Sequence, residues 1–418
     1  MGWMPVPGLH RHAGSVGRTD EQIGSIACDW AVKTSKKSAV KIEQKQYSIK
    51  SGWEILRKGT VGTKPYDLVL AFGSPGLLSD SAIYVSIKND YPSADVLLCS
   101  TAGEIADIRV NDDSVSLVAL QLERTRIRTA AVCMDGTKDS FQAAHELAGQ
   151  LPVTDLKSVL LISDGLQVNG SDLMLALQEV LPEGIIITGG MAGDSARFTA
   201  SLVGLNEMPV PGNIAAIGFY GNRLRVTFGS AGGWDSFGVE RLITRSEKNI
   251  LFELDRQPAL DIYKRYLGEY ADELPGSGLL FPLSIKTPES DYPLVRTILS
   301  VNEQDKSVTF AGNMPEGAYA QLMKANFDRL IDGAADAAQN SLKDGLKEPD
   351  LAILISCVGR KLVLHHRIEE EIEIIRSIYG EKTVLTGFYS YGEFSPVTDL
   401  GKCELHNQTM TITTITEE

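Results

Sequence analysis

The sequence predicts an α/β fold of two domains, in which repeated strand–helix–strand units build mixed sheets flanked by helices, together with β-hairpins. Three segments carry the same order of features: a short apolar strand, a polar turn, a helix, a second apolar strand and a corner of Gly followed by an acid. The corner acids are Glu104, Asp194 and Glu393. Because parallel strands place ligand groups at their carboxyl ends, these corners are candidate ligand positions.

The first strand of each unit is a run of Leu, Val and Ile without alternation, which is typical of a strand buried on both faces. These runs lie in Asp67–Gly73, Ser158–Gly165 and Leu351–Arg360. Each run is followed by a helical segment, and in the second unit Leu173, Leu177 and Val180 lie at i, i+4 and i+7, which predicts one apolar stripe packed against the sheet. The helical segments are Ser79–Asn89, Ser171–Leu181 and Arg367–Tyr379, and they end at Pro92, Pro182 and Gly380.

The segments around these units predict further elements. Ile49, Trp53 and Leu56 have helical spacing and predict a first helix over Tyr47–Arg57. Adjoining β-rich segments predict hairpins, and later segments predict helices, a surface excursion and a half-buried last strand. These are the hairpins Ser114–Glu123 with Arg126–Val132 and Asn213–Tyr220 with Leu224–Phe228, the helices Gln257–Leu267 and Ala318–Leu342, the excursion 268–292 and the strand Glu404–Ile415.

Changes in composition predict how the chain is divided. Residues 1–38 are rich in Gly, Pro and basic residues with little periodicity, which is typical of a loose arm. Together with the first helix, this arm gives an N-terminal region over residues 1–59. A composition shift near residue 250 then separates an N-terminal domain, 60–250, from a C-terminal domain, 251–418.

Charge and cysteine content argue against several classes of protein. A net charge of −14 argues against a nucleic-acid-binding surface. No apolar stretch approaches the roughly 20 residues of a membrane helix, and the N-terminus has no apolar run like that of a signal peptide. The five cysteines are widely spaced and form no CxxC pair, which argues against a zinc site or a disulfide framework. We therefore expect a cytoplasmic protein that binds no nucleic acid and does not insert into the membrane.

Six short motifs, in order along the chain, resemble those of the FIST family, a two-part sensory module of FIST N and FIST C domains. The resemblance covers about residues 60 to 415. The motifs that carry it are Ser100-Thr-Ala-Gly-Glu-Ile105, Gly189-Gly-Met-Ala-Gly-Asp194, Met314-Pro-Glu-Gly317, Ser356-Cys-Val-Gly-Arg360, Gly387-Phe-Tyr-Ser-Tyr-Gly-Glu393 and Leu405-His-Asn-Gln-Thr409.

The resemblance implies a sensor of signal transduction. Family members occur alone or fused to kinases, chemoreceptors, cyclic-dinucleotide enzymes and F-box proteins. Stand-alone bacterial members beside histidine kinases include haem-binding nitric-oxide sensors, and amino acids are proposed ligands of others. No kinase or receptor sequence is present here. We therefore expect a sensor whose output is a separate protein, such as the histidine kinase of a two-component system.

His406 is the candidate haem ligand, because a neutral imidazole can bind haem iron. It begins the predicted last strand, next to Asn407, and it can alternatively hydrogen-bond the Gly–acid corner. The pair His365-His366 precedes Glu369 and Glu370, a spacing that can hold a metal but more often gives solvated helix pairs.

Cys357 and Arg360 follow the first strand of the third unit. A guanidinium three residues away, close to a helix start, is expected to lower the pKa of the thiol. Alternatively, Arg360 clamps a carboxylate, either that of a ligand or that of Glu393. A buried Cys beside a structural ion pair is the third reading of these two residues.

The third corner differs from the other two because Tyr389 and Tyr391 precede Glu393. Its carboxylate either binds the amine of a ligand or ties its own loop. Ser100, Thr101 and Asn169 are further polar groups in strand-end loops.

We place the ligand in the third unit, with haem for nitric oxide sensing as the first ligand class. An amino-acid-like metabolite is the second ligand class, and for it Arg360 and Glu393 would take the carboxylate and the amine. A ligand-free interaction scaffold is a further alternative. We expect no enzyme, because no Gly-x-Ser-x-Gly elbow, Walker loop or dinucleotide fingerprint is present, although Cys357, His406 and Glu393 can be written as a nucleophile set.

Overall fold

The computed structural model describes residues 40–59, 64–134, 136–287, 292–343, 345–397 and 402–418. All of these described residues belong to one compact unit. The predicted loose arm lies outside the described residues.

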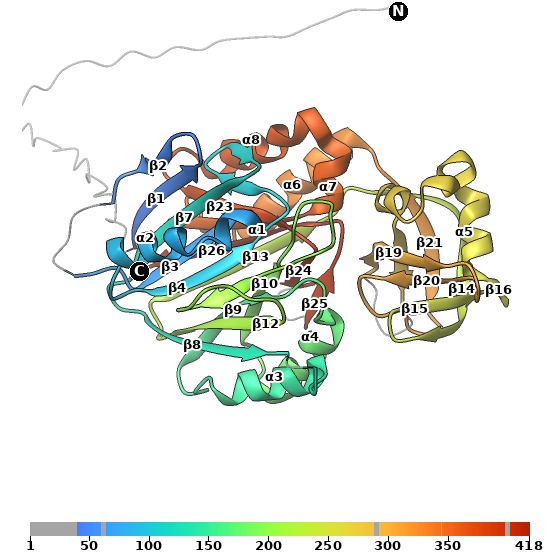
Figure 1. Ribbon diagram of the computed structural model, residues 1–418, viewed down its shortest axis with the longest axis horizontal. Coiled ribbons are helices and arrows are strands. Elements are labelled where there is room, and N and C mark those ends of the chain that lie inside the picture. The colour runs from blue at the N-terminus through green and yellow to red at the C-terminus, as the bar shows by residue number, and fades with distance from the viewer. Residues whose placement is uncertain (1–39, 60–63, 135, 288–291, 344, 398–401) are drawn as a thin grey trace, which may run out of the picture. The chain divides into compact units, whose positions relative to one another are not determined.

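Three mixed sheets form most of this unit (Figure 1). The first sheet has the order β11 (Val203–Leu205), β4 (Asp95–Ser100), β3 (Leu68–Gly73), β7 (Ser114–Gln121), β1 (Lys41–Ser48), β2 (Gly52–Arg57). The second has the order β25 (Cys403–His406), β24 (Gly392–Pro396), β10 (Ile186–Met191), β9 (Leu156–Ser163), β12 (Asn213–Tyr220), β8 (Arg126–Cys133). The third has the order β13 (Leu224–Ala231), β26 (Met410–Glu417), β22 (Leu351–Cys357), β23 (Val384–Ser390), β5 (Glu104–Ala106), β6 (Arg109–Asn111).

Each sheet contains one parallel pair of strands joined through helices. β3 pairs in parallel with β4, β9 with β10 and β22 with β23. The connecting helices are α1 (Pro75–Leu78) and α2 (Ser81–Asp90) in the first unit, α4 (Gly170–Val180) in the second, and α7 (Val358–Leu364), the 3-10 turn His365–Arg367 and α8 (Ile368–Tyr379) in the third. This confirms the predicted strand–helix–strand units and the α/β fold with mixed sheets.

After each Gly–acid corner, the chain leaves its own sheet and adds a strand to a neighbouring one. β5 pairs with β23, β11 with β4 and β24 with β10, each time antiparallel. Figure 1 shows the last of these exchanges as red β24 beside green β10. The exchange is cyclic: the first unit contributes to the third sheet, the second to the first and the third to the second. It therefore ties the three sheets into one body.

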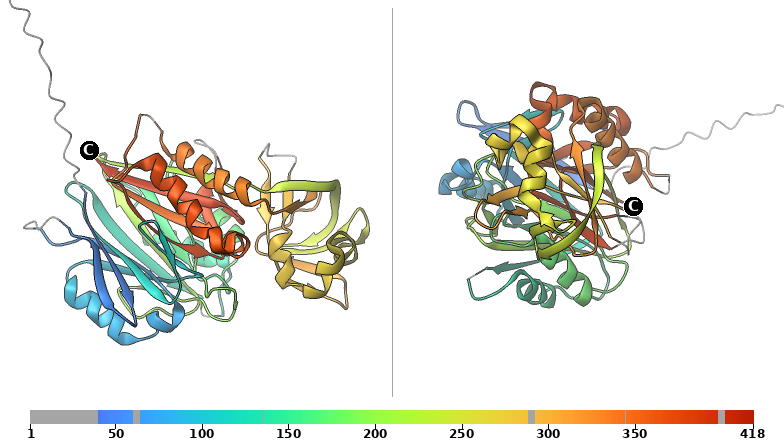
Figure 2. Two further views of the ribbon diagram at one scale, coloured as in Figure 1. Left: turned by 90° about the horizontal axis from the view of Figure 1, so that it is seen from above. Right: turned by 90° about the vertical axis from the view of Figure 1, so that its right-hand side faces the viewer.

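The core lies on both faces of these sheets. On the inner side, Leu70 of β3, Ile162 of β9 and Ile353 of β22 belong to one cluster. On the outer side, α2 covers the first sheet, while α3 (Ser140–Gly149), α4, α6 (Phe327–Ser341) and α8 cover the other two. Figure 2 shows α6 and α8 side by side on one face. Burial of both faces is the physical reason for the uninterrupted apolar runs in the sequence.

A fourth sheet is inserted between β13 and α6 and has its own core, which includes Leu251, Phe310 and Leu322. Its main order is β18 (Leu294–Arg296), β17 (Leu283–Lys286), β21 (Tyr319–Lys324), β14 (Asp235–Glu247), β15 (Ile250–Leu254), β20 (Ser307–Phe310), β19 (Ile298–Asn302), and β16 (Gln257–Pro258) pairs with β15. α5 (Ala259–Leu267) and the 3-10 helices Gly268–Glu273 and Gly276–Leu280 complete this insertion.

The two predicted hairpins are wrong in their pairing, although their strands are present. β7 lies in the first sheet, whereas β8 pairs with β12 in the second. β13 likewise leaves β12 and pairs with β26 in the third sheet. The reason is that β7 already has β3 and β1 as neighbours, and β12 already has β9 and β8, so neither strand has a free edge for the strand that follows it.

The predicted helix over Tyr47–Arg57 is also wrong, because this segment belongs to the hairpin β1–β2. The three apolar residues at helical spacing do not share a buried face: Ile49 is 78% exposed in the turn and Leu56 is 42% exposed. Trp53 packs instead on Tyr47 across the hairpin, with ring centroids 5.3 Å apart. Pairing of β1 with β7 fixes the extended conformation here.

Three further predictions need correction. The helix predicted over residues 318–342 is β21 followed by α6, which begins where the Asn326 side chain accepts from the Arg329 N–H. The predicted last strand is two strands, β25 in the second sheet and β26 in the third. The excursion over residues 268–292 includes β17, and Leu283 is buried there. The domain boundary near residue 250, where β15 begins, stays a prediction.

Candidate functional site

The three Gly–acid corners meet at one place, which we call the exchange centre and define as residues 100–104, 191–194 and 389–393. In each corner, at least one backbone N–H donates to a carbonyl oxygen of another corner. The bonds run from Ala102 N to Tyr389 O at 2.8 Å, from Gly193 N to Ser100 O at 2.9 Å and from Tyr391 N to Met191 O at 3.2 Å. The corners that follow the parallel strands are therefore hydrogen-bonded to one another.

The acids of the first and third corners accept hydrogen bonds from hydroxyl groups that surround them. Glu393 accepts hydrogen bonds from the hydroxyl groups of Ser390 at 2.7 Å and Thr409 at 2.9 Å, and Glu104 accepts from those of Thr101 and Ser114. Burial raises the pKa of Glu104 to about 7 and that of Glu393 to about 8, although these hydrogen bonds oppose the shift. Both carboxyl groups are buried and are not presented to solvent.

Asp194 of the second corner is held by more donors. Its carboxylate accepts from the backbone N–H groups of Phe198, Thr199 and Ala200, from the Thr199 hydroxyl and from the phenol of Tyr391. Burial raises the pKa of Asp194, but the hydrogen bonds together outweigh it and leave the pKa below its usual value. Tyr391 thus reaches from the third corner to the second, where its ring stacks on Phe198 at 4.4 Å.

The carboxylate partner of Arg360 is Glu371 of α8 and not Glu393. Arg360 Nε and Nη2 donate to the same Glu371 oxygen at 2.9 and 2.5 Å, and the guanidinium also donates to the carbonyls of Gly232 and Leu330. The Tyr389 phenol donates to the other Glu371 oxygen at 2.8 Å. Arg360 and Tyr389 are fully buried. This network uses four of the five N–H donors of Arg360 and pairs its buried charge with Glu371 instead of the carboxylate of a ligand.

The Cys357 thiol is buried, and burial raises its pKa, with the nearby Glu393 charge acting in the same direction. The expected lowering by Arg360 is present but smaller, so the prediction of a reactive thiol is wrong in its direction. Glu393 and His406 face each other across β24 and β25. Among the described residues, however, no hydrogen bond joins the thiol, the imidazole and the carboxyl group into a nucleophile set.

His406 does not fit the role of a haem ligand in this conformation. Its Nε2 donates to the Ser395 carbonyl at 2.9 Å, and the residue is only 8% exposed. Burial lowers its pKa to about 4, so the ring is neutral. In the part of the chain that the structure describes, no histidine lines the cavities of about 530, 420 and 210 Å³. An iron would need a free ring nitrogen facing an apolar slot.

Asn407 belongs to a structural contact with the fourth sheet. Its side chain accepts from the Thr297 N–H at 3.4 Å and donates to the His406 carbonyl at 3.0 Å, and it is fully buried. Nearby, the Arg296 guanidinium donates to the Leu405 carbonyl at 2.9 Å. These bonds hold the inserted sheet against β25.

A cavity of about 210 Å³ lies beside the exchange centre, and we call it the strand-end cavity. It opens at the carboxyl ends of β9 and β10, where α/β sheets commonly bind ligands. Of the predicted ligand-binding residues, Tyr391 lines it. The core contributes the loop Gly165–Asn169 with Met191 and Tyr391, and the fourth sheet contributes Asn249, Leu299, Phe310 and Ala311.

The polar side chains of the strand-end cavity are amides. Asn169 caps α4 with its oxygen and donates to Asn313 at 3.1 Å, which in turn donates to Asp172 at 2.8 Å. Asn249 donates to the Phe310 carbonyl at 2.8 Å. The volume lies below the roughly 300–1,000 Å³ of pockets for drug-sized ligands. The cavity is therefore suited to a small polar molecule.

The sequence indicated only residues on the core side of this cavity. Asn169 stood out as a polar residue in a strand-end loop, and Tyr391 as a residue of the third corner. Asn249 and Phe310 carried no signal, because they reach the cavity only through the docking of the inserted sheet.

Two other expectations concern metals and membranes. Among the described residues, no group of three or more His, Cys, Asp or Glu side chains is placed to hold a metal ion, and this includes the pair His365-His366. No helix of the described segments has the length and apolarity needed to cross a bilayer.

Comparison with known proteins identifies the family. The chain is 22% identical over 237 residues to the uncharacterized protein MJ1623 of Methanocaldococcus jannaschii, an alignment that covers 50% of this chain and 45% of that protein. The model of the FIST N domain matches residues 67–257, and that of the FIST C domain matches residues 259–396. The chain therefore belongs to the FIST family, whose domains are signal-transduction sensor domains that bind small ligands.

Proposed function

We propose that this protein senses a small polar metabolite in the strand-end cavity and passes the signal to a separate protein, such as a histidine kinase, in the cytoplasm. The observation that carries the proposal is the composition of the cavity wall. One side belongs to the core and the other to the inserted fourth sheet. A ligand there contacts both parts at once, so its binding energy depends on their separation.

The contacts around the cavity offer a route for the signal. Asn313 follows β20 of the fourth sheet and bonds to Asn169 and Asp172 at the start of α4. Arg296 of β18 bonds to the Leu405 carbonyl in β25. A ligand that tightens or loosens this seam shifts the balance between two positions of the fourth sheet, and a partner protein that binds one of them reads the change.

The cavity lining indicates the ligand class. Its polar side chains are Gln167, Asn169 and Asn249, and its apolar walls include Phe310 and Tyr391. Amides recognise hydroxyl, carbonyl and amide groups through neutral hydrogen bonds. The earlier idea of Arg360 and Glu393 as an amino-acid clamp finds no support, because Arg360 is bonded to Glu371. We therefore favour an uncharged polar metabolite, with zwitterionic amino acids as a second set to be screened.

A thermal-shift screen with a blocked variant tests the proposal. A ligand at 100 times its Kd should stabilise the wild-type protein by about 2.7 kcal/mol. Ala311→Leu places extra atoms in the cavity and should abolish that stabilisation. Ala335→Leu is the matched control, because this half-buried residue lies on α6 away from the cavity. A ligand that stabilises the Ala311→Leu protein as strongly as the wild type would contradict the proposal.

Haem with nitric oxide is the ligand pair that the family resemblance implies, and absorbance separates it from a metabolite. Because His406 is bonded to Ser395, we expect added haem to give no Soret band that depends on His406. A band that appears with the wild-type protein, shifts with nitric oxide and disappears in His406→Ala would overturn this expectation and favour haem sensing.

A further inference from the structure

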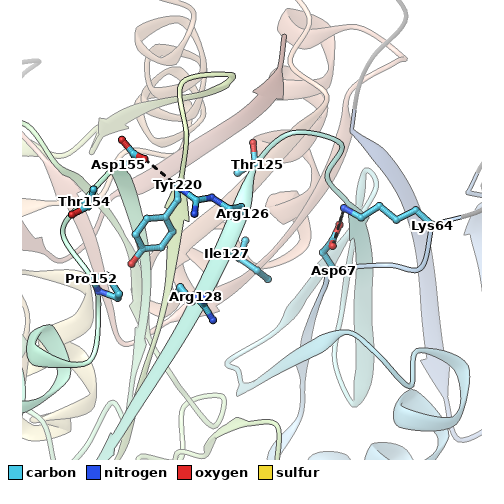
Figure 3. Close-up of a pocket in the computed structure, with 10 residues that line it drawn as sticks. All are labelled: Lys64, Asp67, Thr125, Arg126, Ile127, Arg128, Pro152, Thr154, Asp155 and Tyr220. Atoms are coloured by element: carbon cyan, nitrogen blue, oxygen red, sulfur yellow. Dashed lines mark hydrogen bonds and ion pairs between the residues drawn. The ribbon is translucent and has the colours of Figure 1, made fainter.

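A second cavity, of about 530 Å³, opens at the other end of the sheets (Figure 3). Asp67 precedes β3 and Asp155 precedes β9, so the cavity lies at the amino ends of the parallel strands. β9 has eight residues and separates the two ends by roughly 25 Å. We call this the amino-end cavity, and it is distinct from the strand-end cavity.

The charges that line the amino-end cavity are unequal. Its three cationic side chains are Lys64, Arg126 and Arg128, and its two carboxylates are Asp67 and Asp155. Lys64 lies 3.1 Å from Asp67, and Arg126 lies 3.4 Å from Asp155, so both carboxylates are paired. Arg128 forms no ion pair or side-chain hydrogen bond with any described residue. One guanidinium is therefore left for a partner from outside.

A buried hydroxyl group lies in the same wall. Tyr220, at the end of β12, is 4% exposed, and its phenol has no hydrogen-bond partner among the described residues. Burial raises the pKa of Tyr220, while the charge of Arg128 acts in the opposite direction, which shows that the two groups are close. Buried hydroxyl groups in folded proteins are usually bonded, so one without a partner calls for an explanation.

The surroundings select for an anion. The whole chain carries a net charge of −14 and repels anions in general, so an excess of cations in a concave site is a specific local feature. A guanidinium binds carboxylate and phosphate oxygens with two parallel hydrogen bonds. The volume falls within the range of sites for small organic molecules.

We propose that the amino-end cavity is a second ligand site, which binds a small organic oxyanion through Arg128, with Tyr220 as a neutral donor and Arg126 at the rim. The oxyanion is a carboxylate or a phosphate group, because both match the guanidinium in the same way. The site lies between Asp67 of the first unit and β8 and β12 of the second sheet.

Titration calorimetry with inorganic phosphate and with succinate, at constant ionic strength in chloride buffer, tests the proposal. At least one of the two anions should bind the wild-type protein with saturation at one site. Arg128→Gln should weaken that binding at least tenfold, as expected for the loss of hydrogen bonds to a charged group. Tyr220→Phe should weaken it about three- to tenfold. Tighter phosphate binding would identify a phosphate ester as the ligand, and tighter succinate binding a carboxylate.

Arg124→Gln is the matched control, because it removes the same charge four residues away from a side chain outside the cavity. It should leave the affinity within twofold. Ala311→Leu, which blocks the strand-end cavity, should also leave anion binding unchanged. The failure of the anion-site proposal can therefore be distinguished from the failure of the proposed sensor site. Equal weakening by Arg124→Gln and Arg128→Gln, or no saturable binding of either anion, would overturn the proposal.

Discussion

The strands that lead into the second and third corners share their backbone geometry, but the two corners hold their acids in different ways. Gly189 and Gly387 occupy equivalent positions in β10 and β23, with φ near +149° and +154°. Asp194 accepts from three backbone N–H groups and two hydroxyl groups, and its pKa is lowered. Glu393 accepts from one backbone N–H group and two hydroxyl groups, and its pKa rises to about 8.

This difference shows that burial alone does not set the charge of a carboxyl group. Desolvation favours the neutral form in both corners but acts more strongly on the deeper Glu393, and Asp194 also has more donors, so both differences favour the anion at Asp194. The second corner therefore holds a charge in the exchange centre, whereas the third holds a carboxyl group that is mostly protonated at neutral pH.

The largest effect is expected where the two corners are the same. In Gly189→Ala and in Gly387→Ala, the new Cβ would lie 1.8 Å from a backbone carbonyl oxygen, of Leu161 or Leu354 respectively. Because these oxygens belong to the paired strands β9 and β22, they have no room to move, and each variant should lose at least about 3 kcal/mol of unfolding free energy. Urea denaturation measures the loss. Gly76→Ala, in open space on α1, should change stability by less than about 1 kcal/mol.

The next effect separates the two acids. At pH 7, Asp194→Asn should destabilise the protein by about 3 kcal/mol, because an amide group cannot accept all the bonds made to the carboxylate. Glu393→Gln should cost only about 1 kcal/mol, because the native group is mostly protonated and resembles an amide. Equal losses in the two variants, measured by urea denaturation, would show that the corners do not differ in charge.

The pH dependence of stability should follow the same difference. The pKa of Glu393 is raised from about 4.3 in the unfolded chain to about 8, so the folded state binds more protons between these values. The contribution of Glu393 is therefore largest below pH 4 and is lost as the pH rises to 8, with a slope of at most about 1.4 kcal/mol per pH unit. Glu393→Gln should flatten this slope. Asp194 acts in the opposite sense, and its contribution is lost as the pH falls below about 4.

The smallest effect concerns the thiol beside the third corner. In a Cys28→Ser background, the native protein should show one thiol that reacts quickly with a disulfide reagent, the exposed Cys133. Cys357 should react only after unfolding, because its thiol is buried and its pKa is raised. Loss of the fast reaction in Cys133→Ser would agree with this assignment. A fast reaction that persists there and disappears in Cys357→Ser would contradict it.

Much of the local structure was predictable from the sequence. The apolar runs located β3, β9 and β22, because a strand buried on both faces needs such residues at every position. The helical stripe of the second unit located α4 almost to the residue. The repeated Gly–acid corners correctly marked three units that share the same order of strands and helices.

The predictions were wrong where the structure depends on which strands pair with each other and which charged side chains pair with each other. The segments β7 and β8 look like a hairpin along the chain, but both edges of β7 are already taken. For Arg360, a clamp on a ligand or on Glu393 and a structural ion pair were the alternatives, and α8 brings Glu371 to it as the ion-pair partner. Local sequence patterns do not show which distant strand pairs with a given strand edge, or which distant side chain pairs with a given charged group.

The sequence by itself determined the repeated units, their buried strands and the special corners, because each depends on residue types within a short stretch. Only the tertiary structure decided the cyclic exchange of β5, β11 and β24, since strand pairing depends on which edges lie open in three dimensions. It also decided that most of the predicted ligand-binding residues form hydrogen bonds with other groups of the protein. The cavities formed instead at the seam with the fourth sheet and at the amino ends of the strands, where side chains from separate elements meet.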